Sequence, residues 1–418
     1  MASALIKRRE DAARRLDGLS LPQFRGRPGW EFTDISGLDL DRYNAADAAA
    51  APGGPDAVAL PFGIAPHDAA CWLELRDGQQ TPVLGTGLPD GVIVTTLERA
   101  MAEHSELVAR HLGSVVSGEG DALVTRNDAG LSGGAFIHVP RGVAVEGPIV
   151  LTSIQTQPGT ELHHHAVIVL EEGAQAEVWE QFVSGADELD GVFNVVTELV
   201  VGAAATLRYI GAQDLAETSW IFGTQRAEIS RDGSLDWVAL GFGSARGHVR
   251  METRLGGPGA DARVTGAYAT HKRQHIDFDT TQEHAAPNTT SDLAFRGVLQ
   301  DRSTAVWKGN IIVDPGAQKT DAFQESRNLL LSKRAHADAI PGLEIQANDV
   351  RCTHAAAIAQ VDPEQLFYLR SHGLPEADAK RLVIEGFLSA LVQRFEAGTV
   401  REVLGAALER RLGLVLGA

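Results

Sequence analysis

One glycine-led motif recurs through the middle of this chain and limits the folds that the chain can adopt. It reads GAQAEV from Gly173, GAAATL from Gly202, GSLDWV from Gly233 and GADARV from Gly259, at spacings of 29, 31 and 26 residues. From about Asp121 to Leu343 the hydrophobic pattern has a period of two, and helical patterns vanish. Self-similarity at this period predicts a solenoid in which each unit is a strand, a turn that glycine permits, and another strand. Stacked units bury the apolar side chains that a single unit would leave exposed.

A parallel β-helix also explains the glycine content of the chain. Glycine makes up 44 of the 418 residues, well above the usual ~7%. Weaker copies of the motif, DRSTAVW from Asp301 and GAQKTD from Gly316, extend the pattern. A β-sandwich is the alternative, since short strands with turns also fit it, but the near-regular spacing favours the solenoid.

Both ends of the chain have helical patterns. Residues Ala2 to Leu19 form an amphipathic pattern, and Thr95 with Glu98 makes a capping box before a helix that runs to about Leu112. Near the other end, Asp362-Pro363 is typical of a helix start and Gly373 of a helix end. Two further helices are expected from Pro375 and Thr399.

These patterns divide the chain into three predicted domains. We expect an N-terminal helical domain over residues 1–120, with a low-complexity linker near 45–57. A parallel β-helix core is expected over 121–358, and a C-terminal helical domain over 359–418. The fold class is therefore mainly β with helical ends.

Composition excludes several classes of function. The formal net charge of −18 argues against a nucleic-acid footprint and against binding to an anionic membrane surface. No apolar run is long enough for a signal peptide or a membrane span. The two cysteines, Cys71 and Cys352, make no disulfide framework and fit a reducing cytoplasm.

Histidines are the first leads for chemistry, because the sequence has no phosphate-binding loop, nucleophile elbow or CxxC pair. His163–His165 looks like a metal-binding run, but the middle residue of three on a strand faces away from its neighbours, which favours an ordinary polar strand start. His271, His275, Asp277 and Asp279 share one strand parity and could bind a divalent ion. A strand that faces solvent or a partner is the favoured alternative.

A second lead is the segment Arg351-Cys352-Thr353-His354. Cys352 and His354 share parity, so on a strand their side chains point the same way. A thiol and an imidazole on one face could bind iron or zinc, or could form a nucleophile pair. Otherwise the cysteine is a small buried hydrophobic residue, as cysteines often are.

Several segments, taken in order along the chain, resemble the SufB/SufD family of iron–sulfur cluster assembly proteins. The C-terminal signature is carried by LEIQANDVRCTH and LFYLRSHGL. HAAPNTTSD, RGVLQDRSTAVWKGNIIV and GAQKTDAFQESRNLLLS resemble the family core, and GGAFIHVPRGV resembles its first strands. LPQFRGRPGWEFTD resembles a segment near the start of SufD-like members.

The resemblance implies a right-handed parallel β-helix between helical domains, and a non-catalytic scaffold subunit of the Suf complex. It implies pairing with SufB through the β-helix and docking of the ATPase SufC on the C-terminal helices. For the chain alone, a monomer and a homodimer are both left open. His354 and, ranked below it, Cys352 would be candidate ligands for a nascent cluster or iron at the SufB interface. The isolated chain would hold no cofactor stably. The candidate SufC contacts are Leu382, Val383, Phe387 and Leu391.

Three positions place the chain on the SufD-like side of the family. Ser326 and Ala335 stand where SufB-like members carry cysteines, and neither a serine hydroxyl nor a methyl group can replace a thiolate. Ala355 stands where SufB-like members have a glutamate after the histidine. His372 and Phe32 replace a usual arginine and a common tyrosine without affecting the family assignment.

Two other functions compete with the scaffold. One is a stand-alone β-helix enzyme that acts on carbohydrates, for which Asp277, Asp279 and Glu283 are the candidate carboxylates. The other is a structural partner protein with no ligand site at all. Metal analysis of a purified complex separates the scaffold from the structural partner, and an activity screen tests the enzyme.

Overall fold

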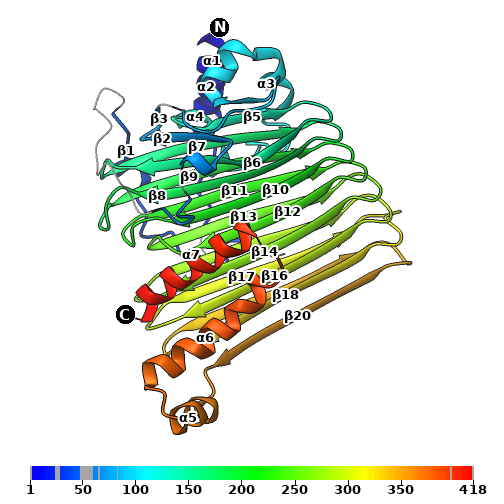
Figure 1. Cartoon of the computed structure of the whole chain (residues 1–418). Helices are drawn as coiled ribbons and strands as arrows, with labels where there is room; N and C mark the ends of the chain where they lie inside the picture. Colours follow the sequence, from blue (N-terminus) through cyan, green and yellow to red (C-terminus); the bar gives the residue numbers. More distant parts are fainter. Residues whose placement is uncertain are drawn as a thin grey trace.

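The computed structural model describes residues 2–23, 29–47, 60–64, 66–81, 83–395 and 398–416. Its strands stack into a β-solenoid of about eight turns, with helices at both ends (Figure 1). The predicted β-helix with helical ends is therefore confirmed. The predicted linker at 45–57 lies largely outside the described residues, and the division into three domains stays a prediction.

Each turn of the solenoid gives one strand to each of two sheets, which we call sheet A and sheet B. The strands pair in parallel along both sheets, except for the antiparallel pairs β4–β5 and β2–β3 near the N-terminal end. Sheet A follows the order β19-β17-β15-β13-β11-β9-β7-β5-β4, and sheet B the order β20-β18-β16-β14-β12-β10-β8-β6-β2-β3. The short strand β1 (Asn44–Ala45) pairs with β7.

The bounds of the strands in sheet A are β4 Ile93–Thr96, β5 Ala135–Val139, β7 Thr160–Leu170, β9 Gly191–Val201, β11 Trp220–Ile229, β13 Arg246–Leu255, β15 His275–His284, β17 Thr304–Val313 and β19 His336–Ile345. Those in sheet B are β2 Cys71–Arg76, β3 Gln79–Gln80, β6 Ala144–Gln155, β8 Gln175–Ser184, β10 Thr206–Asp214, β12 Ser234–Gly241, β14 Asp261–Thr270, β16 Thr290–Leu299, β18 Asp321–Leu330 and β20 Arg351–Gln360.

The turns between strands explain only part of the glycine repeat. Gly173 and Gly259 have positive φ angles of 70° and 75°, as the repeat predicted, but Ala204 and Asp232 occupy the left-handed position in the other two turns. Gly202 is required for a different reason. A Cβ atom there would lie 2.6 Å from the carbonyl oxygen of Leu170, so the close approach of two backbones excludes a side chain.

Most of the solenoid interior is one apolar core, which buried polar side chains such as those of Glu180 and Gln324 interrupt. Large rings contact one another along it: the centroid of Phe295 lies 5.3 Å from that of Phe278 and 6.3 Å from that of Trp307. Tyr209 and Trp237 form a further edge-to-face pair at 5.8 Å, and all of these side chains are buried. One unit could not bury such rings by itself, and this is why the units stack.

Four helices cover the N-terminal end of the solenoid: α1 Ala2–Leu16, α2 Leu97–Glu103, α3 Ser105–His111 and α4 Ala122–Gly130. The single helix predicted from Thr95 to about Leu112 is broken at His104 into α2 and α3. Two further details differ from the sequence prediction. The side chain of Thr96, not Thr95, caps α2 by accepting a hydrogen bond from the backbone N–H of Arg99. Helix α4 lies where a helix-free region was expected; Asp121 caps it through the N–H groups of Leu123 and Val124.

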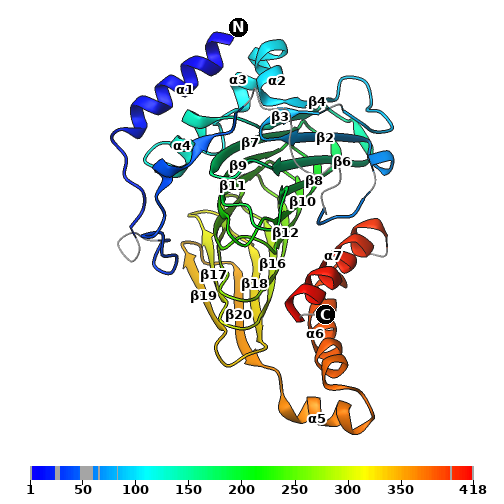
Figure 2. The same cartoon turned by 90° about the vertical axis from the view of Figure 1, so that its left-hand side faces the viewer.

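The C-terminal helices are α5 Pro363–Ser371, α6 Glu376–Val392 and α7 Thr399–Leu416. Helices α6 and α7 pack along the outer face of sheet B, whereas α5 lies beyond the end of the solenoid (Figure 2). The predicted cap at Asp362 and stop at Gly373 are both confirmed: Asp362 accepts a hydrogen bond from Glu364 N–H, and Gly373 has φ +93°. No helix in the described ranges is long and apolar enough to cross a membrane.

The two ends of the solenoid are built differently. The N-terminal end is closed by the antiparallel strands and by α1–α4, but β19 pairs only with β17 and β20 only with β18 among the described strands. The in-register partners show that Leu343, Ile345 and Ile358 continue the interior face of the solenoid. They are 36%, 43% and 45% exposed, so the last turn leaves its apolar core uncovered. We call this end of the solenoid the open end.

Candidate functional site

Cys352 and His354 lie on β20, the last strand, and point toward the uncovered interior of the open end. Their partners on β18 are Ala322 and Gln324, which are both buried inside the solenoid. Side chains at paired positions of parallel strands face the same way, so Cys352 and His354 share that interior face. The predicted common parity of the two residues is thus confirmed.

The environments of these two side chains differ. Cys352 packs partly against the small apolar cluster of Ile311, Val313 and Ala322, and burial together with the charge of Asp321 raises the pKa of its thiol. The thiol is therefore protonated near neutral pH and needs a metal or a cation to become a ligand. His354 is exposed, and its ring makes no hydrogen bond with the described residues. It is the more accessible of the two donors.

These two donors do not make a complete metal site. In the described ranges, no group of three or more histidine, cysteine or acidic side chains is arranged to hold a metal ion. Cys71, which is distant from Cys352 in the sequence, is buried in the core, and burial raises the pKa of its thiol to about 11. Within the described part of the chain, Cys352 and His354 therefore have no third ligand beside them.

The metal site considered around β15 is wrong for the described residues. A segment before β1 crosses the outer face of sheet A, and Thr33 Oγ1 donates to Asp277 Oδ2 at 2.5 Å and lies 3.0 Å from His275 Nε2. Asp277 also meets His248 Nδ1 at 3.1 Å. His271 lies in the turn before β15 and pairs with Glu217 instead. His275 and Asp277 are therefore engaged in holding this segment, and His271 is engaged with Glu217.

The histidine run on β7 alternates as its strand parity predicted. His164 faces the solenoid interior, where its ring nitrogens meet Ser153 Oγ at 3.0 Å and Glu180 Oε1 at 2.9 Å. His163 and His165 face outward and are covered by the N-terminal helices. The run is thus split between two polar clusters and does not converge on one ion.

The four apolar residues predicted to bind SufC do not form a single surface. Leu391 is 3% exposed and packs on the solenoid, and the half-buried ring of Phe387 lies 5.0 Å from the guanidinium of Arg296. Val383 is half-buried, and Leu382 is 49% exposed. Of the four, Leu382 is the residue most available to a partner.

The sequence prediction missed two exposed aromatic residues on α5. Phe367 is 73% exposed and Tyr368 is 62% exposed, on a helix that has no buried residue. The available signal was the run Leu366-Phe367-Tyr368-Leu369, because a short helix cannot turn four consecutive apolar or aromatic side chains toward a single neighbour.

Residues 153–387 match the SUF system FeS cluster assembly, SufBD core domain, and residues 77–151 match the SufBD protein N-terminal region. The chain belongs to the SufBD family. The iron-sulfur cluster assembly protein SufD of Bacillus subtilis is 33% identical over 340 residues, which are 80% of this chain and 78% of the relative.

Two further SufBD relatives extend the comparison. A SufBD family protein of Mycobacterium tuberculosis is 30% identical over 78% of this chain and 84% of its own length. A SufBD family protein of Synechocystis is 25% identical over 96% of this chain and 89% of its own length. The chain is therefore an iron–sulfur cluster assembly protein of the SufBD family and a homologue of SufD.

The structure also locates the two positions where SufB-like members were expected to carry cysteines. Ser326 lies inside the solenoid on β18 and is fully buried. Ala335 is 7% exposed in the turn before β19. Neither residue supplies a sulfur ligand, and neither is exposed at the open end.

Proposed function

We propose that this SufBD family chain is a non-catalytic scaffold subunit that pairs with SufB through the open end of its solenoid. The observation that carries the proposal is the uncovered pair of edge strands, each of 10 residues, with exposed core residues beside them. A long, flat, apolar edge is a template for pairing with another chain, and proteins keep such edges covered. A partner with a similar edge would complete both the sheets and the core.

In this proposal the cargo is a nascent iron–sulfur cluster or iron, held between the two subunits. His354 would be the main ligand from this chain, because it is exposed on the face that the partner covers. Cys352 would be a second ligand, with its thiol deprotonated on binding. The missing ligands would come from SufB. We place this assembly in the cytoplasm, where both thiols, which are unpaired here, stay reduced.

A stand-alone carbohydrate-active enzyme is less well supported by the contacts of its candidate carboxylates. Asp277 is 3% exposed and is bonded to Thr33 and His248, and Glu283 pairs with Arg226 and Arg254. Asp279 faces Lys308 at 3.5 Å. A glycosidase needs one carboxyl group free to give a proton and another beside the scissile bond.

Co-expression of the chain with SufB and SufC homologues tests the proposal. We expect one complex on sizing that contains this chain and SufB in equal amounts, with iron and sulfide bound. When expressed alone, the chain should pair with a second copy through the same edge. A chain that stays monomeric and does not bind SufB at micromolar concentration would refute the scaffold proposal.

The chain by itself should not hold a stable cluster. Four thiolates are the usual ligands of an iron–sulfur cluster, and this chain has only the distant pair Cys71 and Cys352. After anaerobic reconstitution with iron and sulfide, followed by desalting, the isolated protein should be colourless. Visible absorbance that corresponds to one cluster per chain would contradict the assignment of the ligands to an interface.

We further propose that SufC docks on α5 and on the exposed side of α6. Leu382→Asp should abolish SufC capture in a pull-down while changing the stability of the chain by less than ~0.5 kcal/mol, because the side chain is exposed. The matched variant Leu391→Asp removes a buried leucine and inserts a charge, so it should destabilise the C-terminal helices by more than about 3 kcal/mol. Normal SufC capture by Leu382→Asp would place the docking site elsewhere.

A further inference from the structure

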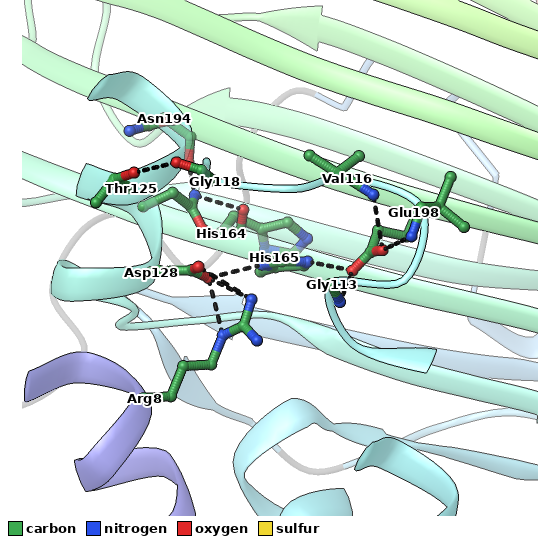
Figure 3. A network of polar contacts seen from close by, with 12 residues as sticks. Arg8, Gly113, Val116, Gly118, Thr125, Asp128, His164, His165, Asn194 and Glu198 are labelled. Carbon is green, nitrogen blue, oxygen red and sulfur yellow. Dashed lines mark hydrogen bonds and ion pairs between the residues drawn. The ribbon is translucent and has the colours of Figure 1, made fainter. Parts of the chain in front are cut away.

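Four ionisable side chains meet in a largely buried cluster where the N-terminal helices cover the solenoid (Figure 3). His165 of β7 is fully buried, and its Nε2 atom lies 2.9 Å from Oε1 of Glu198 on β9. On the other side of the ring, Nδ1 faces Oδ1 of Asp128 on α4 at 3.7 Å. Arg8 of α1 donates to both oxygens of Asp128, at 2.8 and 3.0 Å. We call these four residues the latch.

The latch joins separate parts of the chain. Glu198 also accepts hydrogen bonds from the backbone N–H groups of Gly113, Val115 and Val116, at 2.6, 2.8 and 3.0 Å. Through its members, the loop after α3, helix α4 and helix α1 are all tied to two strands of the solenoid. Apolar contacts that include Leu5 support the same junction.

The charges of the latch balance only when the imidazole is protonated. Two carboxylates then face one guanidinium and one imidazolium in a site where Asp128 is 2% exposed and Glu198 is not exposed. A neutral imidazole would leave one negative charge uncompensated in the interior, which is costly. Burial alone would lower the pKa of His165, but the carboxylates of Asp128 and Glu198 outweigh it and the pKa is raised above its ordinary value.

Other charged groups near the latch do not replace the proton on His165. Arg15 of α1 reaches Asp128 only at 4.0 Å and is half exposed. His111 of α3 interacts electrostatically with Glu198. Burial, the larger effect, and the charge of Arg110 lower the pKa of His111, so its ring is neutral near pH 7. His163, on the same face of β7, is also neutral because burial lowers its pKa.

We propose that the protonated His165 holds α1 and the loop 113–116 against the solenoid, and that loss of this proton releases them while the solenoid stays folded. The direction of the pH dependence follows from the groups involved. A raised histidine pKa gives a stabilisation that is complete below the unfolded value and is lost as the pH rises through the folded value. Asp128 and Glu198 have lowered pKa values in spite of burial, because His165 stabilises their charged forms, so the latch also fails in acid.

Hydrogen exchange on the full chain tests this proposal. Exchange followed by mass spectrometry between pH 6 and pH 9.5, corrected for the intrinsic rates, should show protection of α1 and of residues 113–116 falling at least tenfold. Protection of the interior strands, such as β12 and β14, should stay constant over the same range. A protection of α1 and the loop that does not change with pH in this range would overturn the proposal.

Two variants sharpen the test. His165→Gln keeps a polar side chain but cannot carry the charge, so α1 and the loop should exchange fast at every pH, with no pH step. His163→Gln is the matched control on the same face and should keep the wild-type step. If His165→Gln does not fold, Arg8→Gln serves instead, because Arg8 is partly exposed; it should lower the protection of α1 and keep the pH step. A wild-type pH step in His165→Gln, or no loss of protection in Arg8→Gln, would refute the latch.

Discussion

Aspartates at both Ile345 and Ile358 are expected to abolish pairing of this chain with SufB and with a second copy of itself. The two isoleucines lie at the open end, 43% and 45% exposed, where the core of the solenoid has no further turn to cover it. Full burial of an exposed isoleucine contributes about 1.5–3 kcal/mol, so covering these half-exposed side chains contributes about half as much each, and a buried unpaired carboxylate costs more. Two substitutions should therefore weaken association by at least a thousandfold, equivalent to about 4 kcal/mol.

Sizing and co-purification measure this loss, and a third aspartate provides the control. Leu414 is 60% exposed on α7, away from the open end, so Leu414→Asp should still allow pairing with SufB and with a second copy of the chain. Circular dichroism should show unchanged β-structure in the double variant, because both substituted side chains are exposed in the isolated chain. A double variant that still co-purifies with SufB in equal amounts would mean that the partner covers another surface.

Replacing His354 by alanine is expected to cut the iron and sulfide content of the assembled complex by roughly tenfold or more. Loss of groups that only support a ligand already costs 10–100-fold in metal affinity, and a direct ligand should cost at least as much. Assembly itself should persist, because a single exposed ring contributes little to a large interface. The measurement is cluster content per complex, with subunit stoichiometry determined on the same sample.

Cys352→Ala is the companion to this variant and should have a milder effect. The thiol is partly buried against Ile311 and Val313, and its raised pKa disfavours the thiolate before metal binds.

Full cluster content in His354→Ala would remove that residue from the ligand set. Failure of His354→Ala to assemble with SufB would assign it a packing role instead.

Local patterns were enough to predict most of the elements and their stacking. A repeat near 29 residues, with a period of two inside it, allows few structures other than a solenoid. The caps at Asp362 and Gly373 could be located because they depend on backbone groups within a few residues. Helix α4 could not be foreseen, because its apolar positions show no clean helical stripe. Its buried residues Leu123 and Val124 contact strands and loops elsewhere in the sequence.

The amino-acid sequence by itself determined the solenoid, the shared face of Cys352 and His354, and the opposed directions of His164 and His165. These follow from the period of the strand, which fixes where each side chain points whatever lies around it. Only the tertiary structure decided what each face meets. It buried Leu391 against sheet B, left Phe367 exposed on α5, bonded Thr33 to Asp277, and joined Arg8 to a carboxylate 120 residues away. Such contacts depend on how distant segments pack, and no local pattern encodes that.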